Sequence, residues 1–158
     1  MPKKYKLVLI QPRFWAGKNN ELNRNQGALM PLGLAYIAAY TPDHWEVEIL
    51  DEQVQSFHYI DADLVGITAT VGSITRGYEI AAEYRKKKVP VIMGGVQVTT
   101  LPDEALEYCD SVVLGDAEPV WATIIADFES GKLKKRYEAP QADIAGLKLP
   151  RTELLKII

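Results

Sequence analysis

The sequence contains very little cysteine and histidine. Its 158 residues hold one cysteine, Cys109, and two histidines, His44 and His58. A single thiol excludes a disulfide framework, a zinc cluster or an iron–sulfur cluster built from this chain alone. Both histidines fall on predicted connections, where we expect surface residues, so we assign no metal ligand. Cys109 lies on the apolar side of a predicted helix, where we expect buried packing.

Long hydrophobic runs and a basic surface are missing too. The apolar run Leu7–Ile10 is far too short for a signal peptide or a membrane span, which predicts a cytoplasmic protein with no membrane partner. The net charge is −3, and the basic cluster Lys86–Lys88 is expected at the solvated end of a helix. We therefore predict no nucleic-acid partner. The composition, 47% apolar and 25% charged, is typical of one globular domain.

Short apolar runs alternate with helical patterns along the chain. This alternation predicts an α/β fold, a doubly wound, flavodoxin-like parallel sheet of about five strands. The expected strands are Tyr5–Gln11, Trp45–Asp51 near the sheet edge, Leu64–Thr68, the run from Val89 to the glycine pair, and Ser111–Leu114, with Leu133–Glu138 as an extra edge strand. The expected helices are Pro31–Thr41, Ile74–Lys87 with Ser73 as its N-cap, one begun by Pro102 and one opened by Pro119.

Small and polar residues follow several of these strands. In an open parallel sheet, ligands bind outside the carboxyl ends of the strands. There the glycine pair Gly94 and Gly95 provides either a floor that a ligand approaches closely or merely a tight strand-to-helix turn. The candidate cofactor-binding residues at this edge are Gln11, Thr68, Thr70, Ser73, Gly94, Gly95, Val96, Gln97, Gly115, Asp116, Ala117 and Glu118.

The residue types at this edge predict a binding site and not a catalytic site. Its only carboxylates are Asp116 and Glu118, which helix capping explains equally well, so we assign no catalytic residue. A dinucleotide site needs Gly-x-Gly-x-x-Gly after the first strand, where Gln11 is followed by Pro-Arg-Phe-Trp-Ala. A P-loop and the carboxylates of a phospho-receiver are also missing. FMN stays open, because hydroxyl-rich loops and aromatic side chains suffice to bind it.

Four sequence blocks, in order and at matching intervals, resemble one family. They are Pro31-Leu-Gly-Leu-Ala-Tyr-Ile-Ala, Asp63-Leu-Val-Gly-Ile-Thr-Ala-Thr, Val91-Ile-Met-Gly-Gly-Val-Gln-Val-Thr and Val113-Leu-Gly-Asp-Ala-Glu-Pro. The chain resembles, over residues 5 to 138, the N-terminal cobalamin-binding domain of B12-dependent radical SAM enzymes. That group includes the anaerobic magnesium-protoporphyrin monomethyl ester cyclase.

The resemblance implies that cobalamin lies across the carboxyl edge of a Rossmann-like sheet. Its nucleotide tail would enter beside the third and fourth strands, where Thr68 and Thr70 match the family's hydroxyl position and Gly94 and Gly95 its glycine pair. The family's Gly-Glu-x-Glu-like block is matched by Gly115, Asp116, Ala117 and Glu118. Residues 1–139 would form the cobalamin-binding domain. Residues 140–158 would be a linker toward a radical SAM domain that carries a 4Fe–4S cluster and S-adenosylmethionine.

The chain departs from the wider B12 fold at the cobalt ligand. Members that bind cobalt through histidine carry Asp-x-His-x-x-Gly, whereas this chain has Leu22-Asn-Arg-Asn-Gln-Gly27, with Arg24 at the histidine position. The resemblance therefore implies base-off binding without a protein histidine on cobalt. Gln97 stands where relatives often have histidine. A docking domain that has lost its cofactor and a flavodoxin-like FMN carrier remain as alternatives. By itself this part of the enzyme is not expected to catalyse a reaction.

Overall fold

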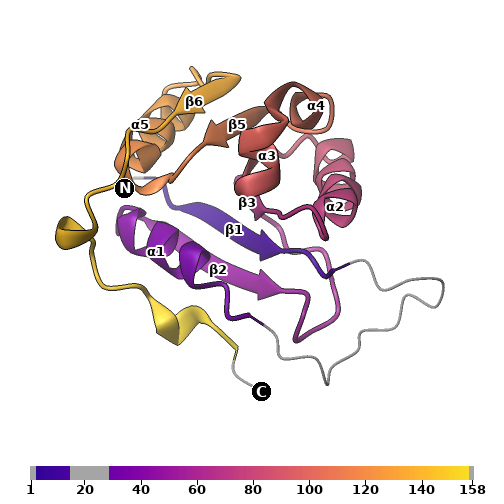
Figure 1. The fold of residues 1–158 in the computed structure, drawn as a ribbon, viewed down its shortest axis with the longest axis horizontal. Helices are drawn as coiled ribbons and strands as arrows, with labels where there is room; N and C mark the ends of the chain where they lie inside the picture. The colour runs from indigo at the N-terminus through magenta and orange to yellow at the C-terminus, as the bar shows by residue number, and fades with distance from the viewer. Residues whose placement is uncertain (1–2, 15–28, 157–158) are drawn as a thin grey trace.

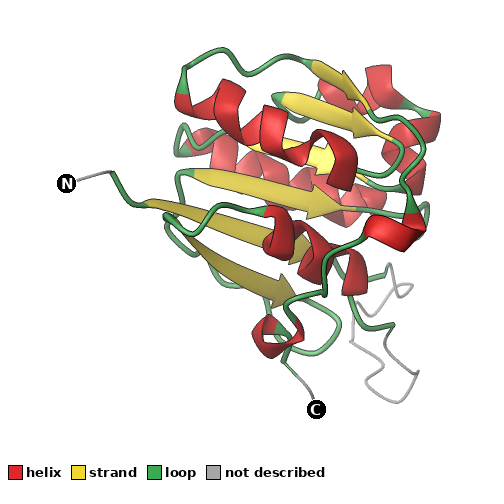
Figure 2. Cartoon of the chain, turned by 90° about the vertical axis from the view of Figure 1, so that its left-hand side faces the viewer, coloured by secondary structure: helices red, strands yellow, loops and turns green. Residues whose placement is uncertain are grey.

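A six-stranded, all-parallel sheet lies at the centre of the computed structural model, which describes residues 3–14 and 29–156. Figure 2 shows the strands pointing in one direction. The spatial order is β2-β1-β3-β4-β5-β6. The strands are β1 (Tyr5–Gln11), β2 (Trp45–Asp51), β3 (Leu64–Thr68), β4 (Val91–Gly94), β5 (Ser111–Leu114) and β6 (Arg136–Glu138). The predicted α/β fold is confirmed, with the extra edge strand present as β6.

Helices cover both faces of the sheet (Figure 1). On one face lie α1 (Leu32–Tyr40) and α5 (Glu118–Glu129), and on the other lie α2 (Ile74–Lys86), α3 (Val96–Thr100) and α4 (Pro102–Leu106). The short helix α3 is not predicted by the sequence patterns. Ser73 occupies the N-cap position of α2, but its side chain makes no capping hydrogen bond. Its hydroxyl oxygen instead accepts the backbone N–H of Thr70 at 3.0 Å.

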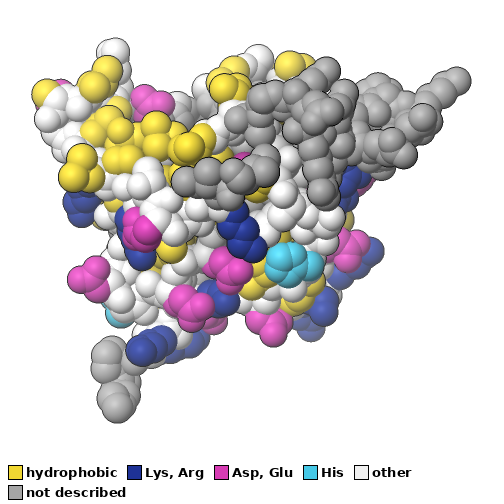
Figure 3. Space-filling view, turned by 90° about the horizontal axis from the view of Figure 1, so that it is seen from below, with side chains coloured by type: hydrophobic (Ala, Val, Ile, Leu, Met, Phe, Trp, Pro, Cys, Tyr) yellow, Lys and Arg dark blue, Asp and Glu magenta, His cyan; other side chains and the backbone are white. Residues whose placement is uncertain are grey.

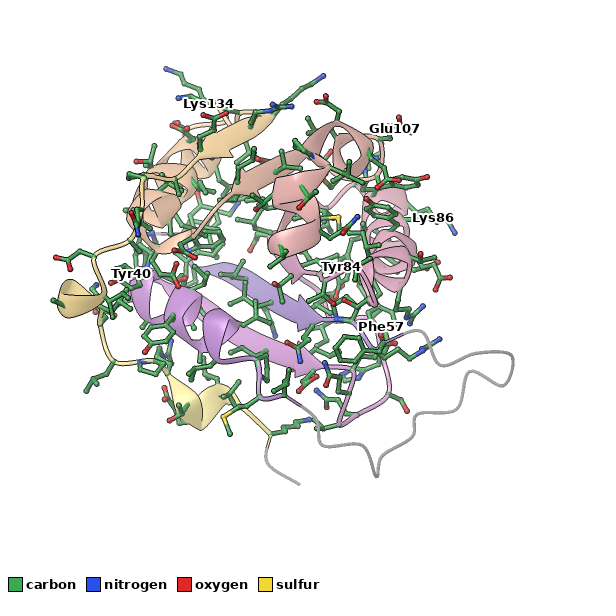
Figure 4. All side chains as sticks on the ribbon, viewed as in Figure 1. Tyr40, Phe57, Tyr84, Lys86, Glu107 and Lys134 are labelled. Atoms are coloured by element: carbon green, nitrogen blue, oxygen red, sulfur yellow. The ribbon has the colours of Figure 1, made fainter. Side chains whose placement is uncertain are left out.

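Successive side chains of the central strands point to opposite faces of the sheet, so the sheet has two separate hydrophobic cores. In β1, Leu7 and Leu9 face α1 and α5, while Val8 and Ile10 face α2. All four are at most 1% exposed, as expected for a parallel strand covered on both sides. Tyr84 is fully buried on the α2 side, where its hydroxyl donates to the carbonyl oxygen of Ile60 at 3.1 Å (Figure 4).

One face of the edge strand β2 is more exposed to solvent than the other. Trp45 and Val47 are buried, whereas Glu46 is exposed and Glu48 half-buried. Lys6 of β1 bridges both glutamates at 3.1 and 3.0 Å. This pattern confirms the predicted position of the strand at the sheet edge.

The segment after β6 packs along α1. The backbone N–H of Arg151 donates to the carbonyl oxygen of Ala35 at 3.0 Å, and that of Lys148 donates to the hydroxyl of Tyr40 at 3.1 Å. Figure 4 labels Tyr40 beside this segment. Leu154 and Leu155 add apolar contacts to the same core. The mostly apolar surface of α1 is thus partly covered by the chain itself, while the role of residues 140–158 as a linker to another domain stays a prediction.

The described surface is mixed in charge on the face seen in Figure 3, where Lys and Arg side chains lie among Asp and Glu. Over residues 3–14 and 29–156, no helix has the length and apolar character needed to cross a bilayer.

Candidate cofactor-binding site

A pocket of about 180 Å³ opens at the carboxyl edge of the sheet, on the face covered by α1 and α5. Four neighbouring strands supply its floor, and the two helices together with the turn between β5 and α5 supply its walls. The floor is lined by Leu9, Gly66, Ile67, Thr68, Ile92, Gly94, Gly95 and Val113. The walls are lined by Gly33, Leu34, Ile37, Gly115, Asp116, Ala117, Glu118 and Trp121. The pocket therefore lies at the edge that strand order predicts for a ligand.

Gly94 leaves room for a Cβ atom in the floor of the pocket. A Cβ atom built at this position would lie 3.9 Å from its nearest neighbours, the Cβ and carbonyl oxygen of Val113. These are ordinary van der Waals distances, so a Cβ fits here, and the atoms of a larger side chain would occupy space in the pocket. The neighbouring floor glycine, Gly66, acts differently, because a Cβ there would come within 2.8 Å of the Leu9 side chain. Gly66 thus allows Leu9 to pack over β3.

Gly95 serves the turn that leads from β4 into α3. Its φ of +104° lies in the region that favours glycine, and a Cβ would come within 2.5 Å of the carbonyl oxygen of Ala69. The tight-turn explanation therefore holds for Gly95, whereas close approach of a ligand to Gly94 stays a prediction. Gly94 borders the pocket as open floor, and Gly95 makes the tight turn.

The deep part of the pocket is apolar, and its polar side chains lie toward solvent. Ile92 and Val113 are each 2% exposed and Trp121 is 3% exposed. The indole N–H of Trp121 donates to the hydroxyl of Thr41 at 2.9 Å, so this buried polar group is already paired. The pocket therefore offers apolar walls to a ligand group that enters it.

The mouth carries hydrogen-bond acceptors. Thr68 is half-buried, Asp116 is exposed and Glu118 is half-buried. Within residues 3–14 and 29–156, neither carboxylate makes a side-chain hydrogen bond or ion pair, and the N-cap of α5, Ala117, has no side-chain cap. Neither Asp116 nor Glu118 therefore caps α5 through a side-chain hydrogen bond. Both carboxylates are able to contact a ligand.

The remaining candidate residues from the sequence lie outside this lining. The Gln11 side-chain amide donates to the carbonyl oxygen of Leu29 at 3.1 Å, and Val96 is 74% exposed. The structure thus brings seven candidates together at the pocket, namely Thr68, Gly94, Gly95, Gly115, Asp116, Ala117 and Glu118. For the other five, Gln11, Thr70, Ser73, Val96 and Gln97, contact with a cofactor stays a prediction.

A buried carboxylate at the same edge was not found from the sequence. Glu52, directly after β2, has a side chain only 1% exposed. Arg76 donates to it from Nε at 2.9 and 3.0 Å and from Nη2 at 2.7 Å, and Arg13 donates from Nη1 and from its backbone N–H at 3.0 Å. Burial lowers the pKa of Arg76, but its hydrogen bonds with Glu52 and Glu79 outweigh this and raise it overall. The cluster ties the chain after β1 to α2.

Neither histidine lies at the pocket. His44 precedes β2 at the amino edge of the sheet, with Nε2 2.6 Å from the Glu129 carboxylate. His58 is exposed in the connection between β2 and β3. The segment Leu22–Gly27, with Arg24 at the expected ligand position, and Trp15 lie outside the described residues.

Comparison with known proteins identifies the family of this chain. A family model described as the B12 binding domain matches residues 24–125. The chain belongs to the B12-binding domain family. A solved structure of the cobalamin-dependent S-adenosylmethionine radical enzyme OxsB, with aqua-cobalamin bound, matches 82% of this chain and 19% of its own. The TM-score is 0.61 at 14% sequence identity, so this likeness shows the B12-binding-like fold alone.

Curated relatives of this B12-binding domain include two methyltransferases from Chlorobaculum tepidum. The chain is 36% identical over 117 residues to a bacteriochlorophyllide d C-8(2)-methyltransferase, covering 73% of this chain and 26% of the relative. It is 31% identical over 138 residues to a bacteriochlorophyllide d C-12(1)-methyltransferase, covering 85% of this chain and 29% of the relative. The chain therefore spans between a quarter and a third of the length of these relatives.

Proposed function

We propose that this B12-binding domain holds cobalamin with its nucleotide tail in the pocket beside Gly94. The observation that carries the proposal is the open floor at Gly94, within the residues matched by the family model. Space left by a missing side chain, at the edge where parallel sheets bind ligands, fits a group that enters between α1 and α5.

The lining suits the chemistry of the tail, which has a planar base, a ribose and a phosphate. A cavity of about 150 Å³ is known to hold benzene. The pocket, at about 180 Å³ with an open mouth, admits one end of a bicyclic base while the ribose extends outward. The base would contact Ile92 and Val113, and the ribose hydroxyls would donate to oxygen atoms of Thr68, Asp116 or Glu118.

Cobalamin would bind base-off, with no protein histidine on cobalt. This part of the proposal is supported by the only two histidines of the chain, His44 and His58, which both lie away from the pocket. A base held in the pocket is also unavailable to coordinate cobalt. Residues of this chain would bind and orient the cofactor without supplying a metal ligand.

The parent enzyme would be a cytoplasmic, B12-dependent radical SAM methyltransferase. We favour methyl transfer over radical cyclisation because the relatives at 36% and 31% identity are named as methyltransferases. Bound cobalamin would supply a cobalt centre able to carry a methyl group. The 4Fe–4S cluster and S-adenosylmethionine would belong to a downstream domain in cis, since this chain has one cysteine. The domain described here would contribute binding and not catalysis.

Titration of the purified chain with hydroxocobalamin and, separately, with FMN tests the proposal. Equilibrium dialysis gives the stoichiometry, and the visible spectrum reports displacement of the lower base from cobalt. We expect one corrinoid per chain with a base-off spectrum and no FMN. Binding of FMN alone would identify a flavodoxin-like carrier. Binding of neither ligand would favour a docking domain that has lost its cofactor.

A further inference from the structure

The pocket separates apolar and polar groups by depth. Its innermost side chains include Ile92, Val113 and Trp121, each at most 3% exposed, and its polar side chains lie at the mouth. The one polar side-chain atom of this inner group, the indole Nε1 of Trp121, is turned to Thr41 at 2.9 Å. The hydroxyl of Thr41 is paired as well, because it donates to the carbonyl oxygen of Ile37 at 2.8 Å. None of these three side chains has a free polar atom for a ligand.

We infer that the pocket selects among corrinoids by their lower base, preferring an apolar benzimidazole to an adenine. This inference rests on the proposed function, because it assumes that the nucleotide tail enters the pocket. Val113 and Ile92 are its specificity-determining residues. Ile92 lies on β4, two residues before Gly94, and Val113 lies beside Gly94 on the adjacent strand β5.

The preference follows from the cost of removing polar atoms from water. Adenine carries an exocyclic amine and additional ring nitrogens, which would lose their hydrogen bonds to water against Ile92 and Val113. A buried donor or acceptor left without a partner costs enough to weaken binding roughly tenfold or more. The dimethylated ring of a benzimidazole loses only apolar surface, which favours burial.

The bond between the lower base and cobalt in the free corrinoid favours the opposite order of affinities. Adenine is the weaker cobalt ligand of the two bases, so an adenine-bearing corrinoid is already more fully base-off in solution. A pocket without selectivity would therefore bind the adenine form at least as tightly. A measured preference for the benzimidazole form would have to come from the pocket.

The direct test compares three corrinoids on the same protein by equilibrium dialysis: cobalamin, its adenine-bearing analogue pseudocobalamin, and cobinamide, which lacks the nucleotide. We expect cobalamin to bind at least tenfold more tightly than pseudocobalamin. Equal affinities for these two would overturn the inference while leaving the proposed function intact. Failure of all three to bind would overturn the proposed function itself.

A pair of matched variants locates the selectivity on one face of β5. Val113→Thr replaces a methyl group with a hydroxyl in the pocket, whereas Val112→Thr makes the same change on the opposite face, in the core under α3 and α4. We expect Val113→Thr to reduce the preference for cobalamin at least threefold and Val112→Thr to leave it unchanged. An unchanged ratio in folded Val113→Thr would contradict the assignment. The comparison of the three corrinoids on the wild-type chain decides the inference even where a variant does not fold.

Discussion

Filling the floor of the pocket at Gly94 provides the sharpest test of where the nucleotide tail binds. In Gly94→Val, the new side chain would project into space whose nearest protein atoms are 3.9 Å from the Cβ position. Gly94 ends β4, where a β-branched residue is favoured by up to about 1 kcal/mol over glycine. We therefore expect the variant to fold with unchanged or slightly increased stability and to lose cobalamin.

The expected loss follows from the surface that the base would bury. Aromatic groups of this kind bury at least roughly 150 Å². At about 25 cal/mol per Å², that burial is worth about 4 kcal/mol. Full exclusion of the base corresponds to roughly a 500-fold change in affinity, and we expect roughly 100-fold to 500-fold because ordering costs offset part of the burial.

The assay is a corrinoid titration of wild-type protein and Gly94→Val, with circular dichroism and thermal melting as the folding control. Cobinamide, which has no nucleotide, should bind both proteins equally. Gly146→Val is a matched control, since Gly146 lies in the 3₁₀ turn Ile144–Gly146 and does not line the pocket. A folded Gly94→Val protein with wild-type affinity for cobalamin would refute the placement of the tail.

Three further predictions concern stability and reactivity. Gly95→Ala should lower stability by about 3 kcal/mol, because alanine is strained at φ +104° and its Cβ would come within 2.5 Å of the Ala69 carbonyl oxygen; thermal melting should show a fall in Tm of roughly 6–12 °C. Glu52→Ala should cost about 3–5 kcal/mol in urea denaturation, because it removes the buried carboxylate that Arg76 and Arg13 share and leaves Arg76 only the more exposed Glu79, and a loss below 1 kcal/mol would contradict this. Burial raises the pKa of the Cys109 thiol to about 11, so Ellman's reagent should detect no thiol in the native chain at pH 8 and one after denaturation.

The position of the pocket was predictable from the sequence because it depends on strand order and direction. Apolar runs punctuated by glycine and proline indicate parallel strands, and the carboxyl ends of parallel strands meet at one edge. Residues such as Thr68, Gly94 and Gly115, which end or directly follow those strands, therefore lie at the pocket. The roles of the two glycines could not be separated in this way, because only the backbone angles and neighbouring atoms distinguish them.

Features that depend on distant partners escaped the sequence. Glu52 is paired with residues 24 and 39 positions away, and nothing in its own neighbourhood indicates this.

The helix α3 was missed because its sequence, Val-Gln-Val-Thr-Thr, is rich in β-branched residues that favour strands. In the structure its threonine hydroxyls donate to carbonyl oxygens four residues earlier, at Gly95 and Val96, both at 2.9 Å.

The floor of the pocket is shared among β1, β3, β4 and β5, so it exists only after residues from Leu9 to Val113 have assembled. A corrinoid held there would have affinity for the native chain and none for the unfolded one. Such a ligand stabilises the fold by about 2.7 kcal/mol when its free concentration is one hundred times the dissociation constant. Corrinoid supply during synthesis would then raise the folded fraction of the newly made chain.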